Sequence, residues 1–272
     1  AETYMLDTKN KIFYRPNWDA PLENFPKDIP SDMPDIVFQI SSGLYGARDK
    51  SGKFDPDRYQ KVMKFCQMTE IKIAQGAKQT GGKLSGAKVT PAIAYYRNVE
   101  AYKDVFSPNR FPYANTIEEL FDFIGKLQEL SQKPVGLKIV ISDIENIEPY
   151  AKEIKRRIDA KISAYPDYIT VDAGSGGSAT APIEMMERVG LNVRDSVYLV
   201  NKVLTDYGVR DKVRIVASGK ILTPDDIIIV MSLGADFLQI ARGFMMSAGC
   251  IRARYCSGTT GRQCPVGLAT QD

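Results

Sequence analysis

Apolar, β-branched runs recur along the chain after residue 34, and each is followed by a stretch in which apolar positions have helical spacing. The first run is DIVFQISSG at 35–43. It ends in Ser-Ser-Gly, as expected of a strand that is buried on both faces and then enters a loop. A helix is predicted at 55–67, because Asp55 can cap it and Pro56 suits its first turn.

The same pattern of a strand followed by a helix repeats five more times. Strands are predicted at 69–78, 135–142, 167–177, 213–220 and 236–243. Helices are predicted near 116–131, 146–163, 195–208 and 223–233, and from about 244, where the last helix carries Cys250. Units of this kind with short connections predict a parallel sheet, because crossover helices join parallel neighbours.

Two parallel folds compete for this pattern. A doubly wound sheet normally has a Gly-x-Gly-x-x-Gly turn after its first strand, and DIVFQISSGLYGARD lacks one. A barrel places functional residues where many strands end. Here the strand ends carry Ser42, Gln75, Ser142, Gly174, Gly219 and Arg242. We therefore predict an α/β fold of the (β/α)8 TIM-barrel type, incomplete in this chain, with about six β/α units recognisable.

The pattern also predicts the domain organisation. Residues 1–34 are polar and dotted with proline, which indicates an N-terminal arm or irregular segment, and 35–272 form the barrel with a cysteine-bearing C-terminal loop. A full barrel has eight strands. Either the arm hides poorly patterned strands, or the first two units lie outside this sequence, which begins with Ala and is expected to be a piece of a longer protein.

Composition narrows the function. The 272 residues contain no apolar run long enough to span a membrane and no signal-peptide pattern, so a cytoplasmic protein is expected. A net charge of +3 from 36 basic and 33 acidic residues gives no electrostatic case for nucleic acid. The absence of histidine excludes Ser-His-Asp catalysis and histidine-ligated metals, so acid–base chemistry falls to Lys, Asp, Glu, Tyr or a cofactor.

Glycine loops and lysines within apolar strands are the first candidate ligand-binding features. The loop DAGSGGSATAP at 172–182 offers backbone N–H groups to a phosphate or an aromatic ring, unless it is only a flexible turn. ASGK at 217–220 and ARG at 241–243 follow the last two strands, where barrels hold phosphate. Lys72 and Lys138 interrupt apolar strands, so each needs a partner or a ligand, unless it reaches outward to solvent.

The cysteines are the second candidate. Three of the four, Cys250, Cys256 and Cys264, lie near the C-terminus, while Cys66 falls in a predicted helix and reads as a buried packing residue. Zinc would need a further nitrogen or sulfur ligand that this region lacks. Three thiolates suit an iron–sulfur cluster, and the alternative is three unrelated small apolar residues.

Several segments together resemble a known family. They are EIKIAQGAK, GGKL, AKVTP, SPNRFPYANTIEELFDFIGKL, VDAGSGGSATAP and the ending GC…C…CPVGLATQD. The chain resembles the FMN-binding synthase domain of glutamate synthases over about residues 36 to 272, in particular the branch that lacks a glutaminase domain.

This resemblance implies a flavin-binding β/α barrel with a 3Fe-4S cluster held by Cys250, Cys256 and Cys264. The implied activity is that of an oxidoreductase acting on CH–NH2 donors. Electrons from ferredoxin or another donor protein or subunit pass through the cluster to FMN, which reduces 2-iminoglutarate, formed from 2-oxoglutarate and ammonia, to L-glutamate. A separate glutaminase subunit is one source of the ammonia. Arg252, Arg254 and Arg262 lie near the thiols and suit an acidic ferredoxin.

The resemblance also implies roles for individual residues. The implied catalytic residues are Lys72, Gln75 and Lys138. The implied cofactor-binding residues are Gln39, Ser42, Lys72, Lys138, Gly176, Gly177, Ser218, Gly219, Ala241 and Arg242.

Two alternatives stay open: the same fold acting on another amine, as in N-methylglutamate synthesis, and a non-catalytic electron-relay or scaffold subunit. The chain departs from the family pattern in three places. The spacing between Cys256 and Cys264 is longer, the loop GAKQTGGKL is shorter, and the family's first two strands have no match in 1–34.

Overall fold

A computed structural model gives the structure of the chain. It describes residues 5–6, 12–14, 35–76, 82–176, 184–186, 188–253, 255 and 264–268.

Six strands form the main sheet. They are β3 (Val37–Ile40), β4 (Met68–Lys72), β7 (Val135–Ile139), β8 (Tyr168–Asp172), β9 (Arg214–Ser218) and β10 (Phe237–Gln239). The hydrogen-bonded order is β10-β9-β8-β7-β4-β3. The pairs β3–β4, β7–β8, β8–β9 and β9–β10 are parallel. A doubly wound sheet reverses its strand order part-way, whereas this sheet keeps chain order throughout. The predicted incomplete barrel of six β/α units is confirmed.

A helix follows each of these strands at the predicted position. The helices are α1 (Pro56–Met63), α3 (Ile117–Ser131), α4 (Glu148–Asp159), α5 (Val193–Asp206), α6 (Pro224–Ser232) and α7 (Arg242–Ser247). The Asp55 side chain caps α1 by accepting hydrogen bonds from two backbone N–H groups of its first turn. One detail of the prediction is wrong. The last helix ends before Cys250, because Gly249 adopts a φ of 100° that terminates it.

Two short antiparallel strand pairs were not predicted. β5 (Lys83–Leu84) pairs antiparallel with β6 (Val105–Phe106), and between them lie η2 (Gly86–Lys88) and α2 (Pro91–Arg97). A further 3-10 turn, η3 (Ile144–Asn146), precedes α4. In the arm predicted to be irregular, β1 (Met5–Leu6) pairs antiparallel with β2 (Ile12–Tyr14).

The chain divides into two compact units. The first comprises Ala1–Ile71, Gly81–Pro112 and Lys126–Val135, and the second comprises Lys72–Thr80, Tyr113–Gly125 and Gly136–Asp272.

The core of the first unit forms where α1 packs on β4. The Tyr59 hydroxyl lies 2.8 Å from the Thr69 hydroxyl, and both side chains are fully buried. Lys133 donates to the carbonyls of Met63 and Cys66 and so satisfies the end of α1. Cys66 is buried, as predicted, and burial raises the pKa of its thiol to about 11. This thiol therefore stays protonated and packs as a small apolar group.

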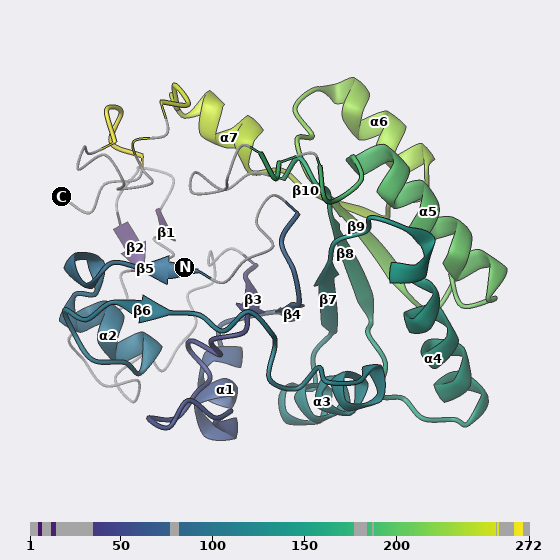
Figure 1. Ribbon diagram of the computed structural model, residues 1–272, viewed down its shortest axis with the longest axis horizontal. Coiled ribbons are helices and arrows are strands. Elements are labelled where there is room, and N and C mark those ends of the chain that lie inside the picture. The colour runs from purple at the N-terminus through teal and green to yellow at the C-terminus, as the bar shows by residue number, and fades with distance from the viewer. Residues whose placement is uncertain are drawn as a thin grey trace. The chain divides into compact units, whose positions relative to one another are not determined.

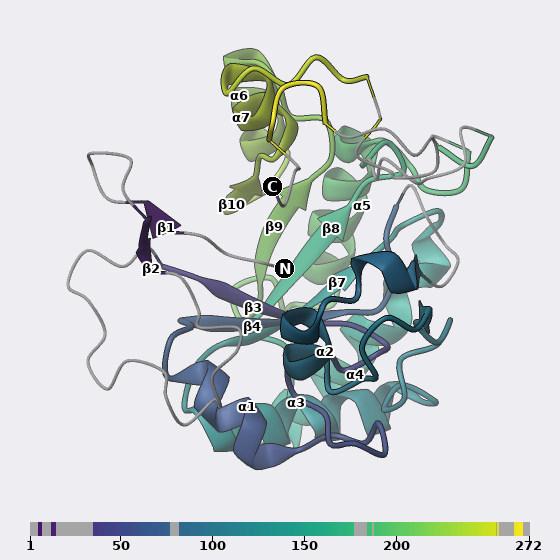
Figure 2. The same ribbon diagram turned by 90° about the vertical axis from the view of Figure 1, so that its left-hand side faces the viewer.

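The core of the second unit lies between its strands and the helices α4, α5 and α6. These helices lie side by side, with α5 against β8 and β9 (Figures 1 and 2). The contact is made by side chains that are completely shielded from solvent, including Ile169, Val171, Val197, Val200 and Ile215. Burial of such β-branched strands against an amphipathic helix supplies the main apolar stabilisation of this unit. Within the described part of the chain, no helix is long and apolar enough to cross a membrane.

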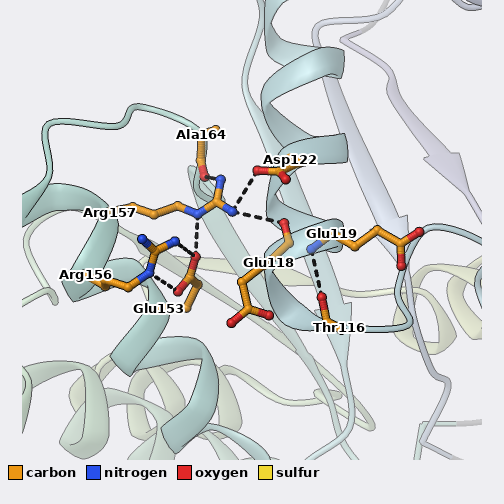
Figure 3. Close-up of polar contacts among 8 residues, drawn as sticks. All are labelled: Thr116, Glu118, Glu119, Asp122, Glu153, Arg156, Arg157 and Ala164. Carbon is orange, nitrogen blue, oxygen red and sulfur yellow. Dashed lines mark hydrogen bonds and ion pairs between the residues drawn. The ribbon is translucent and has the colours of Figure 1, made fainter.

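A buried arginine fastens α4 to α3 (Figure 3). Arg157 is 3% exposed and donates to Glu153 at 2.6 Å and to the carbonyls of Ala164 and Glu118 at 3.0 Å. It also lies 2.8 Å from the Asp122 carboxylate. Hydrogen bonds from Arg156 and from Arg157 hold the pKa of Glu153 at about 2, although desolvation acts in the opposite direction. A charge this deeply buried is tolerated because each of the three guanidinium nitrogens donates to a carboxylate or carbonyl oxygen.

Replacing the buried arginine should therefore cost more stability than replacing its exposed neighbour. We expect Arg157→Met to lower the free energy of unfolding by about 3 kcal/mol or more, because it removes the donor to two carbonyl groups and one of the two arginines that pair with Glu153. Arg156→Met removes a cation that is 55% exposed and leaves Glu153 paired with Arg157, so its effect should be clearly smaller. Urea unfolding of both variants measures the difference, and equal effects would contradict this account.

Candidate functional site

The segment after β4 carries two of the predicted site residues. Lys72 ends the strand, and its ammonium donates to the side-chain oxygen of Gln75 at 2.6 Å. The backbone N–H groups of Ile73 and Ala74 both point to the carbonyl of Lys138, at 3.0 and 3.4 Å. The structure thus brings Lys72, Gln75 and Lys138 onto adjoining segments of the second unit, and all three side chains are half-buried.

The loop after β8 packs tightly against its neighbours. The Ala173 N–H donates to the Ser218 carbonyl at 2.9 Å, which joins the ends of β8 and β9. Asp172, the last residue of β8, is 4% exposed and accepts the Gly76 N–H at 2.8 Å, which joins this loop to the segment after β4. Gly176, one of the predicted glycines, turns back to donate to the Ala173 carbonyl at 2.8 Å.

Two glycines are required by this packing. A Cβ on Gly76 would lie 1.9 Å from the Ala173 carbonyl oxygen, and a Cβ on Gly219 would lie 2.6 Å from the Ala173 Cβ. Gly219 also has a φ of 134°, which side chains of L-residues rarely adopt. The ends of β4, β8 and β9 therefore meet as bare backbone around one buried alanine.

Positive charge gathers beside Gly219. Lys220 follows it directly, and Arg242 begins α7 after β10. Desolvation, and then the positive charges of Arg242 and Arg252, lower the pKa of the Lys220 ammonium. Like charges this close favour the binding of an anion, which relieves their repulsion. This is the place in a β/α barrel, after the last two strands, where phosphate groups are commonly held.

Three further predicted residues lie on β3, in the turn that follows it and directly before α7. Gln39, on β3 in the first unit, donates its side-chain N–H to the buried carboxylate of Glu70 on β4. Ser42 lies in the turn after β3, and Ala241 caps α7 through its carbonyl, which accepts the Met245 N–H at 3.0 Å. Gly177 lies outside the described residues.

The structure describes two of the three cysteines that were predicted to hold a cluster. Cys250 and Cys264 are half-buried, and Cys256 lies outside the described residues. Among the residues that the structure describes, no three His, Cys, Asp or Glu side chains are grouped as metal ligands.

Sequence reasoning missed Asp172 and Lys220. Lys220 stood inside the quoted ASGK motif, and its neighbours were selected for their glycine and hydroxyl chemistry instead. Asp172 showed only as a polar residue at the end of an apolar run, and its partner Gly76 is 96 positions away in the chain.

The comparison with family models gives one decisive match. Residues 19–272 match the model described as a conserved region in glutamate synthase. The chain belongs to the glutamate synthase family.

Individual family members agree with this assignment. The glutamate synthase large subunit-like protein YerD of Bacillus subtilis is 42% identical, over 88% of this chain and 44% of that protein. The archaeal-type glutamate synthase [NADPH] of Thermotoga maritima is 31% identical, over 91% of this chain and 45% of that protein. The chain thus spans less than half the length of these relatives.

More distant matches add context. The glutamate synthase [NADPH] large chain of Azospirillum brasilense is 31% identical, over 87% of this chain and 14% of that protein. Among solved structures, a flavocytochrome b2 variant with pyruvate bound aligns with a TM-score of 0.49 and 13% identity, over 83% of this chain and 46% of that chain. The fold assignment rests on the strand order and not on this weak likeness.

The close packing around Ala173 can be tested with two glycine substitutions. We expect Gly76→Ala to destabilise the protein by about 3 kcal/mol or more, because its Cβ would overlap backbone that cannot retreat. Gly82→Ala is the matched control, since its Cβ would make only an ordinary contact at 3.7 Å with the Ser107 side chain. Thermal unfolding of the two variants measures this. Equal stability would show that the segment after β4 is not packed on Ala173.

Proposed function

We propose that this chain is the flavin- and iron–sulfur-dependent synthase portion of a glutamate synthase-type oxidoreductase, which reduces 2-iminoglutarate to L-glutamate. The observation that supports the proposal most is the gathering, in one unit, of Lys72 and Lys138, of closely packed glycines and of three further cations near the ends of successive parallel strands. Membership of the glutamate synthase family supports the same chemistry.

The chemistry of this edge fits FMN. A flat isoalloxazine ring needs a surface without side chains, and we assign it to the glycine loop, where Gly174 and Gly176 carry none. A phosphate needs cations and free N–H groups, and Gly219, Lys220 and Arg242 lie where barrels commonly provide them. We assign Ser218 and Ala241 to the same phosphate-binding stretches, while the flavin roles of Gln39 and Ser42, which belong to the first unit, stay predictions.

Bound FMN would supply the hydride, and a 3Fe-4S cluster held by Cys250, Cys256 and Cys264 would supply it with electrons from a donor protein. The chain's own residues then have three tasks. Lys138 provides positive charge for the reduced, anionic flavin. Lys72 and Gln75, already joined by a hydrogen bond, bind and orient the dicarboxylate substrate. The packed loops exclude water, which would hydrolyse the imine back to 2-oxoglutarate and ammonia.

The phosphate assignment predicts a selective effect of Lys220. We expect Lys220→Met to weaken FMN binding about tenfold or more, because a hydrogen bond to a charged group contributes about 1.5 to 3 kcal/mol. Riboflavin, which lacks the phosphate, should bind the variant as well as it binds the wild type. Flavin fluorescence titration measures both affinities.

Lys212→Met is the matched control for this prediction. Lys212 precedes β9, whereas Lys220 follows it, and Lys212 already pairs with Asp211. The control should bind both flavins normally. If Lys220→Met weakened FMN and riboflavin equally, the phosphate assignment would be wrong.

The reaction itself can be tested with anaerobically purified protein, reconstituted with FMN, iron and sulfide and reduced with dithionite. Addition of 2-oxoglutarate and ammonia together should reoxidise the flavin and form glutamate, detected by mass spectrometry. Either substrate alone should not, and Lys138→Met should slow the reoxidation. Methylamine in place of ammonia tests the alternative amine. A protein that binds neither flavin nor iron would refute the proposal, and bound but unreactive flavin would favour a relay role.

A further inference from the structure

The strongest unexplained group near the proposed site is a buried carboxylate. Asp172 ends β8, and its side chain points away from solvent with only 4% exposed. A carboxylate in such a place is costly unless hydrogen bonds compensate for its lost hydration. The sequence pattern of β8 does not explain why a carboxylate lies here, because the residues that precede Asp172 in this strand are buried and uncharged.

One oxygen of this carboxylate accepts the Gly76 N–H at 2.8 Å. The other lies beside the glycine loop, since a Cβ on Gly176 would lie 2.7 Å from it. The Asp172 side chain is thus placed between the segment that carries Lys72 and Gln75 and the loop that carries Gly174 and Gly176.

The geometry points to Asp172 as a positioning residue, which holds the Lys72–Gln75 segment against the glycine loop so that both face the same ligand. This inference rests on the proposed function for the identity of the ligand. Asp172 itself need not touch that ligand, because it acts through the backbone of Gly76. What it contributes is the acceptor oxygen, so an asparagine, which keeps one oxygen of the same shape, should serve in its place.

The chain offers a matched control at the opposite edge of the same sheet, where β9 and β10 begin. Asp236 immediately precedes β10, and its carboxylate also accepts a backbone N–H, that of Ile215 near the start of β9, at 2.8 Å. It is further paired with Arg210 at 2.9 Å. Loss of Asp236 should therefore lower stability without disturbing the strand ends where the proposed site lies.

The experiment compares Asp172→Ala and Asp172→Asn with Asp236→Ala. Hydrogen exchange of the Gly76 amide, FMN affinity from fluorescence and thermal stability are measured for each. We expect Asp172→Ala to speed Gly76 exchange and to weaken FMN binding, each about tenfold or more, as loss of a hydrogen bond to a charged group implies. Asp172→Asn should restore both to within about threefold of the wild type. Asp236→Ala should lower the melting temperature but change neither local measure.

Each outcome decides a separate claim. If the wild type bound no FMN, the proposed function would fail, while Gly76 exchange would still test the positioning role. If the Gly76 amide stayed protected from exchange in Asp172→Ala, the positioning role would be overturned. It would also be overturned if Asp236→Ala weakened FMN binding as much as Asp172→Ala does, for the same loss of stability. Should Asp172→Ala not fold, the Gly76 amide decides in the wild type and in Asp172→Asn, where rapid exchange in either folded protein contradicts the hydrogen bond.

Discussion

The approach of three strand ends to a single buried residue is the constraint on which the candidate site depends. Ala173 is completely shielded from solvent, and the chain segments after β4 and β9 come so close to it that Gly76 and Gly219 have no room for a side chain. Hydrogen bonds from Gly76 to Asp172 and from Ala173 to Ser218 fix the approach. Because parallel strands end at the same edge of a sheet, this packing brings residues far apart in the chain to one place.

Charge is distributed unevenly around that packed centre. Lys72 and Lys138 lie on adjoining segments at the ends of β4 and β7. Lys220, after β9, is repelled by the positive charges of Arg242 and Arg252, which follow β10. The two groups of cations differ in what they suit. The lysines beside Gln75 suit a dicarboxylate and an anionic flavin ring, and the cations beside Gly219 suit a phosphate. Under the proposed function, this edge would hold both FMN and the oxo acid.

The sequence predicted the long elements well and the short elements poorly. The strands of the main sheet were found because buried parallel strands are continuous apolar runs, and α1 because Asp55 and Pro56 marked its start. The β5–β6 pair was missed because strands of two residues are too short to show alternation of apolar and polar positions. The lysines in apolar strands stood out, but the partnership of Asp172 with Gly76 did not, since no local pattern reveals a contact between distant segments. The roles of all the predicted site residues stay predictions, and Gly177 and Cys256 also lie outside the described residues.

A crystal structure of the chain grown with FMN tests the central claim most directly. The account predicts that the isoalloxazine ring lies against Gly174 and Gly176, with Lys72 and Lys138 at its edge and the phosphate at Gly219, Lys220 and Arg242. A flavin bound away from these strand ends, or a phosphate that contacts none of those three residues, would contradict it.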